Sequence, residues 1–549
     1  MLIGLTIGFI CLMLIGYRVY SRWIAHQYNL SSKHLTPAHA QRDDVDFIPA
    51  HPFYLFGQHF SAIAAAGPIA GPILACQIFG WGPAVLWILF GAIFIGAVHD
   101  FSSLVASMRH KACSMAEVAQ EYLGRPAGRA MLIFVWFSLA YIILAFTDIT
   151  AGSFVRGTEE LGSSEHRFNP GGAVAAASIF YLVLSIVLGL VQRFLRPPLW
   201  LVSIIFVPMA FGVSYLGTFY SHWFLLDVKT WALIILAYCF LASVLPVWLL
   251  LQPRGYLGGF ILYTALALGM IGIFFGGYEI EQPFFKGFEV GGATGSLFPF
   301  LFVTIACGAC SGFHGLVCGG TTSKQLDRET HSRPIGYGAM LAESFVALIA
   351  IVTVITVSSD SIQGLKPGVI YGNGIGRFLS LIIGEEYLPF AVTFGAMAFS
   401  TFVFDTLDVA TRLGRYILQE LFSWRSKVGA AAGTLLTLVI PVLAIFLAQE
   451  GSWIEFWTLF GAANQLLAGL TLLCVTAWLM KSGRSFWFTL LPMVFVLFIT
   501  IWALSKIVLY QWARADGLSV STLNSLVALI LIVLAVYLVG QAIKVVRQR

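Results

Sequence analysis

The sequence predicts an all-α polytopic membrane protein with about fifteen transmembrane helices. Hydrophobic residues make up 59% of the 549 residues and charged residues only 10%, whereas soluble domains carry about 25% charged residues. So few charges cannot cover a water-exposed surface of this size, and most of the outer surface must therefore face lipid. We expect one membrane domain over residues 1–549, surrounded by lipid and without a nucleic-acid partner.

The second observation is the number of apolar segments long enough to cross a bilayer, which takes about 20 residues. Fifteen segments meet this length, at 2–20, 53–80, 82–108, 129–155, 171–192, 198–220, 228–251, 258–277, 297–320, 337–358, 387–411, 428–448, 453–480, 485–510 and 522–543.

The third observation is the distribution of positive charge between alternate loops. Of the 31 Lys and Arg residues, 23 fall on one set of loops, 7 fall on the other, and Lys506 lies within a span. Cytoplasmic loops carry the excess of positive charge, so the N-terminus is predicted outside and the C-terminus in the cytoplasm. The first span has no basic residue before it, and Arg18 and Arg22 follow it. It is therefore predicted to be a retained helix and not a cleaved signal peptide.

The second span contains two glycines and two prolines in six consecutive residues, which are Gly67, Pro68, Ile69, Ala70, Gly71 and Pro72. Such a run predicts a broken helix. Unwound backbone inside a membrane is tolerated only where protein or a water-filled cavity surrounds it, and it is a natural ligand for ions and charged substrates. A simple proline kink is the alternative.

A weaker break at Ser243–Pro246 lies in the seventh span, five spans later, on the cytoplasmic side of its centre. Because five is odd, two five-span units would have opposite orientations in the membrane. We therefore predict inverted repeats at 53–220 and 228–416, with a substrate site between them. The accessory helices would lie at 1–20 and 428–543.

Ionisable residues inside spans are costly and are functional candidates by default. Seven of them lie toward the predicted cytoplasmic ends, and these are His59, His99, Asp100, His314, Glu343, Asp405 and Asp408. Asp148 alone lies toward the outside. The seven are predicted to form an inner gate, a proton relay or a coupling-ion site, and the alternative is that several of them cap helix ends.

Spacing suggests local roles for four polar residues. Asp408 and Arg412 stand four residues apart on one helical face and are predicted to pair, whereas Asp405 has no such partner. The hydroxyls of Thr304 and Ser311 are predicted to hold a cation against the carbonyls of the second span.

Several functions are disfavoured by the sequence. Cys307 and Cys310 form a C-x-x-C without a second ligand pair, so they are predicted to be packing residues and not a zinc or redox site. The segment 319–324 lacks the spacing of a phosphate loop, and no nucleophile stands at a catalytic spacing from a base. We predict no enzyme activity, no catalytic residue, no metal and no cofactor.

Seven stretches of the sequence match the pattern of a known family, and these are Leu55–Pro72, Gly96–Phe101, Ala242–Tyr256, Leu297–Thr322, Ile335–Val346, Ser400–Glu420 and Phe456–Ala468. By these stretches the sequence resembles the carbon starvation protein A (CstA) family of bacterial inner-membrane transporters. The resemblance implies a leucine-transporter-like core of two inverted five-helix repeats. It also implies uptake of pyruvate, a similar carboxylate or short peptides, driven by protons and linked to carbon starvation.

Two residues depart from the family pattern, because Gln58 replaces a histidine and Gly255 replaces an aspartate. Both changes bear on the substrate and on the coupling ion. Sodium is the alternative to protons, and a membrane sensor or a channel without concentrative transport is the alternative function. The oligomeric state is left open.

Overall fold

The computed structural model describes residues 1–43, 47–155, 168–290, 295–424, 426–448, 452–515, 517 and 519–547. These residues form α-helices joined by turns and short 3-10 or π segments, and no strand longer than an isolated bridge occurs among them. The predicted all-α class is confirmed. The helices are α1 (Leu2–Ile15), α2 (Ser21–Tyr28), α3 (Pro37–Ala40), α4 (Pro52–Ile63), α5 (Gly67–Phe79), α6 (Trp81–Gly91), α7 (Ala97–Arg109), α8 (Met115–Leu123), α9 (Arg125–Phe154), α10 (Pro170–Phe194), α11 (Leu199–Phe219), α12 (Val228–Val244), α13 (Leu251–Phe275), α14 (Leu297–Thr304), α15 (Gly312–Gly320), α16 (Ala339–Ile355), α17 (Ser359–Ile362), α18 (Pro367–Ile383), α19 (Leu388–Leu421), α20 (Lys427–Leu447), α21 (Trp453–Lys481), α22 (Trp487–Trp512) and α23 (Val520–Arg547).

Twelve helical segments of the described chain are long and apolar enough to cross a membrane, or thirteen if the bent pair α4–α5 counts as one span. The other two of the fifteen predicted spans take different forms. The helix α12 has only 17 residues, and the predicted span 297–320 is divided into α14 and α15. Helix length alone therefore yields fewer spans than the apolar segments of the sequence do.

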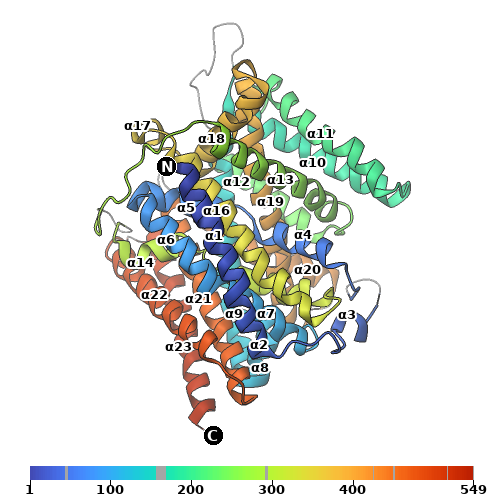
Figure 1. The fold of residues 1–549 in the computed structure, drawn as a ribbon, viewed down its shortest axis with the longest axis vertical. Coiled ribbons are helices and arrows are strands. Elements are labelled where there is room, and N and C mark those ends of the chain that lie inside the picture. The colour runs from blue at the N-terminus through green and yellow to red at the C-terminus, as the bar shows by residue number, and fades with distance from the viewer. Residues whose placement is uncertain are drawn as a thin grey trace. The chain divides into compact units, whose positions relative to one another are not determined.

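The chain divides into two compact units. The first unit comprises Met1–Gly4, Ile142–Gln282 and Ile349–Ala448, and the second comprises Leu5–Tyr141, Pro283–Leu348 and Gln449–Arg549. Each unit draws on segments that are far apart in the sequence, as the colours of Figure 1 show.

In the first unit, α10 packs on α11, and α18 packs on α19 (Figure 1). Small residues allow the close approach of α18 and α19, since a Cβ at Gly372 would lie 2.8 Å from the Cβ of Ala396. A Cβ at Gly376 would lie 2.9 Å from the Cα of Val392. Small residues four apart are typical of helix contacts in membranes, where the apolar surroundings supply no hydrophobic drive.

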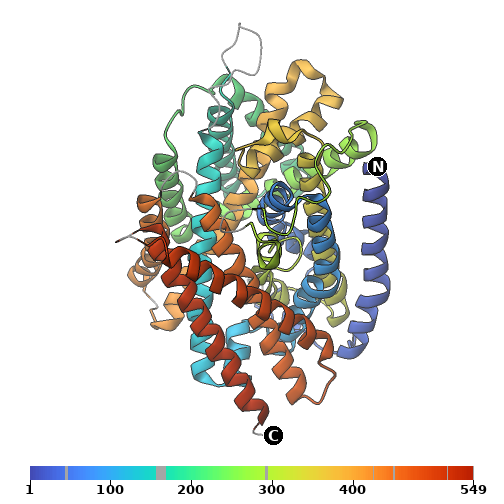
Figure 2. The ribbon, with the colours of Figure 1, turned by 90° about the vertical axis from the view of Figure 1, so that its left-hand side faces the viewer.

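In the second unit, α21 is the central helix, and its most apolar window is completely buried. It packs against α22 and α23 on one side, as Figure 1 and Figure 2 show, and against α14, α15 and α7 elsewhere. Its polar residues Asn464 and Gln465 therefore face protein and must find hydrogen-bond partners there.

Candidate functional site

The bend in the second predicted span lies at Ala64–Ala66, between α4 and α5, and turns the chain by 46°. From the sequence, this break was predicted at Gly67–Pro72, about one helical turn too far toward the C-terminus. Gly67–Pro72 are helical, and Pro72 stands inside the helix. A proline in the first turn of a helix loses no hydrogen bond and already has helical φ. Pro68 stands in that first turn of α5.

The predicted ninth span is also interrupted, and its non-helical residues 305–311 are called the link below. The last carbonyls of α14 have no helical partner, and side chains from other helices supply one. Gln465 Nε2 donates to the carbonyl of Phe302 at 3.2 Å, and Trp457 Nε1 donates to that of Thr304 at 3.2 Å. Trp87 Nε1 donates to the carbonyl of Ile305 at 3.2 Å. The unwound backbone is therefore held by protein.

The two interruptions lie against each other. A Cβ at Gly67 would overlap Cys307 Sγ, and a Cβ at Gly71 would lie 2.5 Å from the carbonyl oxygen of Thr304. Glycine is required at these two positions because the backbone of α5 approaches the end of α14 and the link so closely. The structure thus brings Thr304 beside the glycine- and proline-rich start of α5.

The helix α15 begins at an amide from α21. Asn464 Oδ1 accepts a hydrogen bond from Phe313 N at 2.9 Å, and Asn464 Nδ2 donates to Ser311 Oγ at 3.0 Å. Asn464 Nδ2 also lies 3.4 Å from Cys307 Sγ. The Ser311 hydroxyl, predicted as a cation ligand, is thus engaged by Asn464.

We expect Asn464→Ala to lower the free energy of unfolding by about 1–3 kcal/mol, because it leaves buried polar groups of the link and α15 without partners. Thr458→Ala on the same helix is the control, since the Thr458 hydroxyl donates only to Ile454 O of its own helix. The free energy of unfolding of both variants is measured in detergent. Equal losses of stability in the two variants would contradict the role of Asn464 as the cap of α15.

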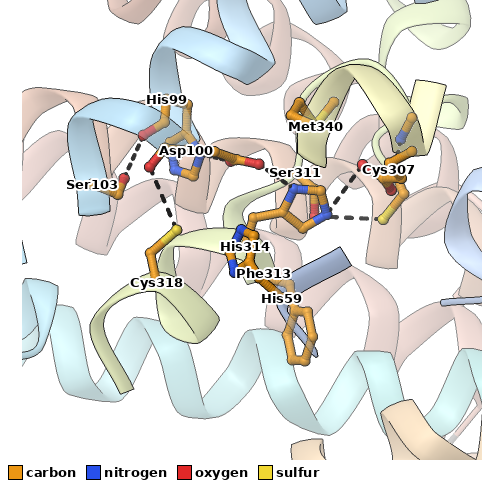
Figure 3. Close-up of polar contacts among 12 residues, drawn as sticks. His59, His99, Asp100, Ser103, Cys307, Ser311, Phe313, His314, Cys318 and Met340 are labelled. Carbon is orange, nitrogen blue, oxygen red and sulfur yellow. Dashed lines mark hydrogen bonds and ion pairs between the residues drawn. The ribbon is translucent and has the colours of Figure 1, made fainter. Parts of the chain in front are cut away.

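Histidines and carboxylates of the second unit form a buried chain of contacts (Figure 3). Asp100 Oδ1 lies 2.7 Å from His99 Nδ1, and Asp100 Oδ2 lies 2.8 Å from His314 Nδ1. His314 Nε2 lies 3.5 Å from Glu343 Oε2, and Glu343 Oε1 accepts a hydrogen bond from Gly308 N of the link at 3.2 Å. The side chains are at most 1% exposed. The chain connects α7, α15 and α16 to the link.

His59 does not join this chain by a direct hydrogen bond. Its Nδ1 lies 2.9 Å from Thr322 Oγ1, and its Nε2 has no hydrogen-bond partner among the described residues. Figure 3 shows His59 close to His314 and Phe313. Six of the polar residues that the sequence singled out therefore lie in one region of the second unit, and these are His59, His99, Asp100, Ser311, His314 and Glu343.

The other two predicted acids, Asp405 and Asp408 on α19, lie in the first unit and share one arginine. Arg254 Nη1 donates to Asp408 Oδ2 at 2.8 Å, and Arg254 Nε lies 3.5 Å from Asp405 Oδ1. Tyr238 OH also donates to Asp408 Oδ2, at 2.9 Å. Arg254 and Asp408 are 2% and 1% exposed, whereas the Asp405 side chain is 23% exposed. One positive charge thus faces two carboxylates.

The predicted pairing of Asp408 with Arg412 was wrong, whereas the partner of Asp405 is Arg254, which lies on another helix. Arg412 Nη2 instead donates to the carbonyls of Ala242 and Leu245, at 2.6 and 2.8 Å. Cations suit the negative C-terminal end of a helix, and α12 ends at Val244.

The break at Ser243–Pro246 is the junction between α12 and α13. Arg415 Nη1 donates to Ser243 O at 2.5 Å, and Ser243 Oγ lies 3.1 Å from Thr434 Oγ1. The polar atoms of Ser243 therefore already have hydrogen-bond partners within the protein.

Asp148 lies apart from these clusters. Its Oδ2 lies 3.3 Å from Lys366 Nζ.

Sequence reasoning did not single out five residues of these sites, which are Arg254, Asn464, Trp87, Trp457 and Tyr238. A signal existed for three of them, since Arg254, Trp457 and Asn464 stand in stretches that resemble the family. Arg254 was counted among the cytoplasmic loop residues because it stands between the predicted spans 228–251 and 258–277.

Many long apolar helices, two interrupted helices and buried ion pairs define a multi-pass membrane transport protein. The carbon starvation protein CstA family model matches residues 2–373 and 365–503, and the chain belongs to this family. A Campylobacter jejuni relative, "Peptide transporter CstA", is 33% identical over 93% of this chain and 81% of its own length. The Bacillus subtilis "Peptide transporter CstA" is 30% identical over 99% and 96%. The Escherichia coli "Pyruvate/proton symporter BtsT" is 32% identical over 91% and 81%. The predictions of the family and of a transporter of nutrients, not an enzyme, are confirmed.

Two solved structures have looser likenesses to the chain. MhsT in complex with L-phenylalanine covers 90% of this chain and 99% of its own, at 12% identity and a TM-score of 0.45. The Eremococcus coleocola manganese transporter in complex with an aromatic bis-isothiourea substituted compound covers 90% and 97%, at 12% identity and a TM-score of 0.43.

Proposed function

We propose that this protein takes up a small carboxylate such as pyruvate, or short peptides, by proton-coupled secondary active transport across a bacterial inner membrane, in response to carbon starvation. The observation that carries the proposal is the contact between the two interrupted helices at Gly71 and Thr304. Two helices, α5 and α15, begin at these interruptions. Helix N-termini carry partial positive charge and favour a carboxylate. The names of the relatives supply the two substrate classes.

For the topology, we propose fifteen crossings with the N-terminus outside and the C-terminus in the cytoplasm. The fifteen include α12 and the interrupted pair α14–α15. In this count, the chain crosses the membrane seven times from α4–α5 to α13, both included. Because seven is odd, α14–α15 enters the membrane in the opposite direction to α4–α5. This parity supports inverted repeats that begin at these two interrupted helices. The second repeat would then start at 297 and not at 228, and the first repeat keeps its predicted span of 53–220.

We assign the gate to the buried chain His99, Asp100, His314 and Glu343. The chain ends on Gly308 N, in the link, so a change in these contacts would release the link. His59, beside His314, would belong to the same gate.

We assign proton coupling to Asp405. The groups that face it or its partners are Arg254, Asp408, Tyr181, Tyr238 and Arg412. Arg412 is already bound to helix carbonyls, so Arg254 is the cation that pairs with both carboxylates. An uncompensated carboxylate is costly in a low dielectric, and one proton or sodium ion neutralises the surplus. Asp405 is the more exposed acid and is the one that an ion reaches.

We expect Asp405→Asn to reduce pyruvate accumulation driven by a pH gradient by at least about tenfold while exchange of labelled for unlabelled pyruvate persists. The reason is that the amide keeps the shape of the side chain but carries no exchangeable charge. Proteoliposome uptake measures both. Asp360→Asn on the exposed helix α17 is the control, and unchanged accumulation in Asp405→Asn would exclude Asp405 as the coupling group.

The function itself is tested by uptake of labelled pyruvate into proteoliposomes, with and without a pH gradient, with and without sodium, and with an excess of dipeptide as competitor. We expect accumulation above the external concentration only with the pH gradient. Accumulation that requires sodium would assign sodium as the coupling ion. Flux of pyruvate without accumulation would favour the channel, and no flux of either substrate would favour the sensor.

A further inference from the structure

Three side chains of the second unit place a sulfur, a nitrogen and an oxygen around one point. Cys307 lies in the link, His314 lies on α15 and Glu343 lies on α16. One potential ligand atom from each residue lies within 4.8 Å of the other two. His314 and Glu343 are fully buried, and Cys307 is partly exposed. This set is called the Cys–His–Glu triad below.

Two atoms of the triad have no hydrogen-bond partner among the described residues. His314 Nε2 and Glu343 Oε2 are buried and lie 3.5 Å apart as an ion pair, but neither makes a hydrogen bond with the described residues. Buried polar atoms are rarely left without hydrogen bonds. A ligand that accepts electron pairs from both atoms would satisfy them together.

The surroundings orient the three donors. Asp100 Oδ2 lies 2.8 Å from His314 Nδ1 and leaves Nε2 directed at the triad. Such a carboxylate behind a histidine is the arrangement that orients metal ligands and raises their basicity. Asn464 Nδ2 contacts Cys307 Sγ at 3.4 Å, and Gly308 N donates to Glu343 Oε1. Figure 3 shows Asp100, His314 and Cys307 in this arrangement.

The donor set selects the class of ion. Thiolate, imidazole and carboxylate together are ligands of Zn²⁺ and related transition metals, with bonds of roughly 2.0–2.3 Å. Calcium and magnesium prefer oxygen ligands alone. Three protein ligands leave a fourth position open, which suits a metal that exchanges or binds a further ligand.

We propose that Cys307, His314 and Glu343 form a binding site for one zinc-class transition-metal ion. The bound ion joins the link to α15 and α16, and so fixes the interrupted helix. No metal was predicted from the sequence, because Cys307 and Cys310 have no second ligand pair at short spacing. The donors of the triad come from separate elements, and only folding brings them together. Cys310, the other half of the C-x-x-C, is not part of the triad.

The experiment uses purified full-length protein in detergent, stripped of metal with a chelator and titrated with Co²⁺ and with Zn²⁺. We expect one Co²⁺ per chain with a thiolate-to-cobalt absorption band, displaced by one Zn²⁺, and a dissociation constant on the order of 1 μM or lower. We expect Cys307→Ser to lose the absorption band and to weaken Zn²⁺ binding at least about tenfold. Cys310→Ser and Cys318→Ser should leave both unchanged.

His314→Gln and Glu343→Gln test the other two donors, and thermal unfolding shows which variants are folded. Cys307→Ser is the smallest change of the three. If the other two variants do not fold, metal binding by Cys307→Ser alone tests the site. The proposal is overturned if wild-type protein binds Co²⁺ without the thiolate band, if it binds no metal, or if Cys307→Ser binds as wild type does. None of these readouts depends on transport, so failure of the metal site is distinct from failure of the proposed function.

Discussion

Replacing Arg254 with glutamine is expected to lower the free energy of unfolding by about 3–5 kcal/mol, the range for breaking a buried ion pair on one side. Arg254 is 2% exposed and pairs with Asp405 and Asp408. Without the guanidinium, two carboxylates face each other in a low dielectric and must take up protons or reach water. Unfolding of the purified protein in detergent measures the loss.

A double variant separates the charge effect from lost packing. Arg254 also lies over the ring of Phe404, at 4.9 Å, so its removal costs contacts as well as charge. Arg254→Gln combined with Asp408→Asn also removes one of the two carboxylates that Arg254→Gln alone leaves without a cation. The double variant should therefore be more stable than the sum of the two single losses predicts. Strict additivity would show that the ion pair contributes little.

Arg254→Lys is the conservative control for the same position. Lysine keeps the positive charge but lacks the planar fork that reaches two carboxylates at once. We expect a stability between those of wild type and Arg254→Gln. A loss as large as that of Arg254→Gln would indicate that geometry, and not charge, dominates at this site.

Replacing Gly71 with alanine is expected to reduce pyruvate uptake at least about tenfold and to destabilise the protein by about 1–3 kcal/mol, the usual range for overpacking. The new Cβ would lie 2.5 Å from the carbonyl oxygen of Thr304. That atom is backbone, and its carbonyl also accepts a hydrogen bond from Trp457. The methyl group must push α5 away from the end of α14, because the backbone there is held in place by Trp457.

Gly259→Ala on α13 is the matched control, since nothing lies within 4 Å of a Cβ at that position. Alanine inside a helix is favoured over glycine by roughly 0.5–1 kcal/mol, so this variant should be as stable as wild type or slightly more so. Full uptake by Gly71→Ala would mean that the contact between α5 and the end of α14 is not needed for transport.

The site was predicted less completely than the helices. The search for ionisable residues inside spans found the buried chain His99, Asp100, His314 and Glu343, because a charge in an apolar segment stands out in any sequence. Their partners did not stand out. Asp408 was paired with Arg412 at four residues along the same helix, whereas its partner, Arg254, lies 154 residues away. A buried carboxylate takes the cation that folding brings closest, and helical spacing does not contain that information.

The break in 297–320 illustrates the same limit. Its residues are mostly apolar, so the segment has the pattern of one span. An interrupted helix survives in the membrane when other residues satisfy the carbonyls at the break. Trp457 and Gln465 do so at the end of α14, and Trp87 does so in the link, from helices distant in the sequence. The proline-rich run at Gly67–Pro72 indicated a break, but the helix resumes at Gly67 because the first turn tolerates proline.

Membrane residence and the all-α class follow from composition and from the length of apolar runs, which are local properties that each segment carries by itself. The resemblance of several stretches to one family could also be recognised from the sequence, since it depends on residue identity alone. The positions of the breaks, the sharing of Arg254 by two acids and the convergence of Cys307, His314 and Glu343 depend on contacts between distant segments. Only the tertiary structure decides these, because a buried polar group is stabilised by whichever partner the packed helices place beside it.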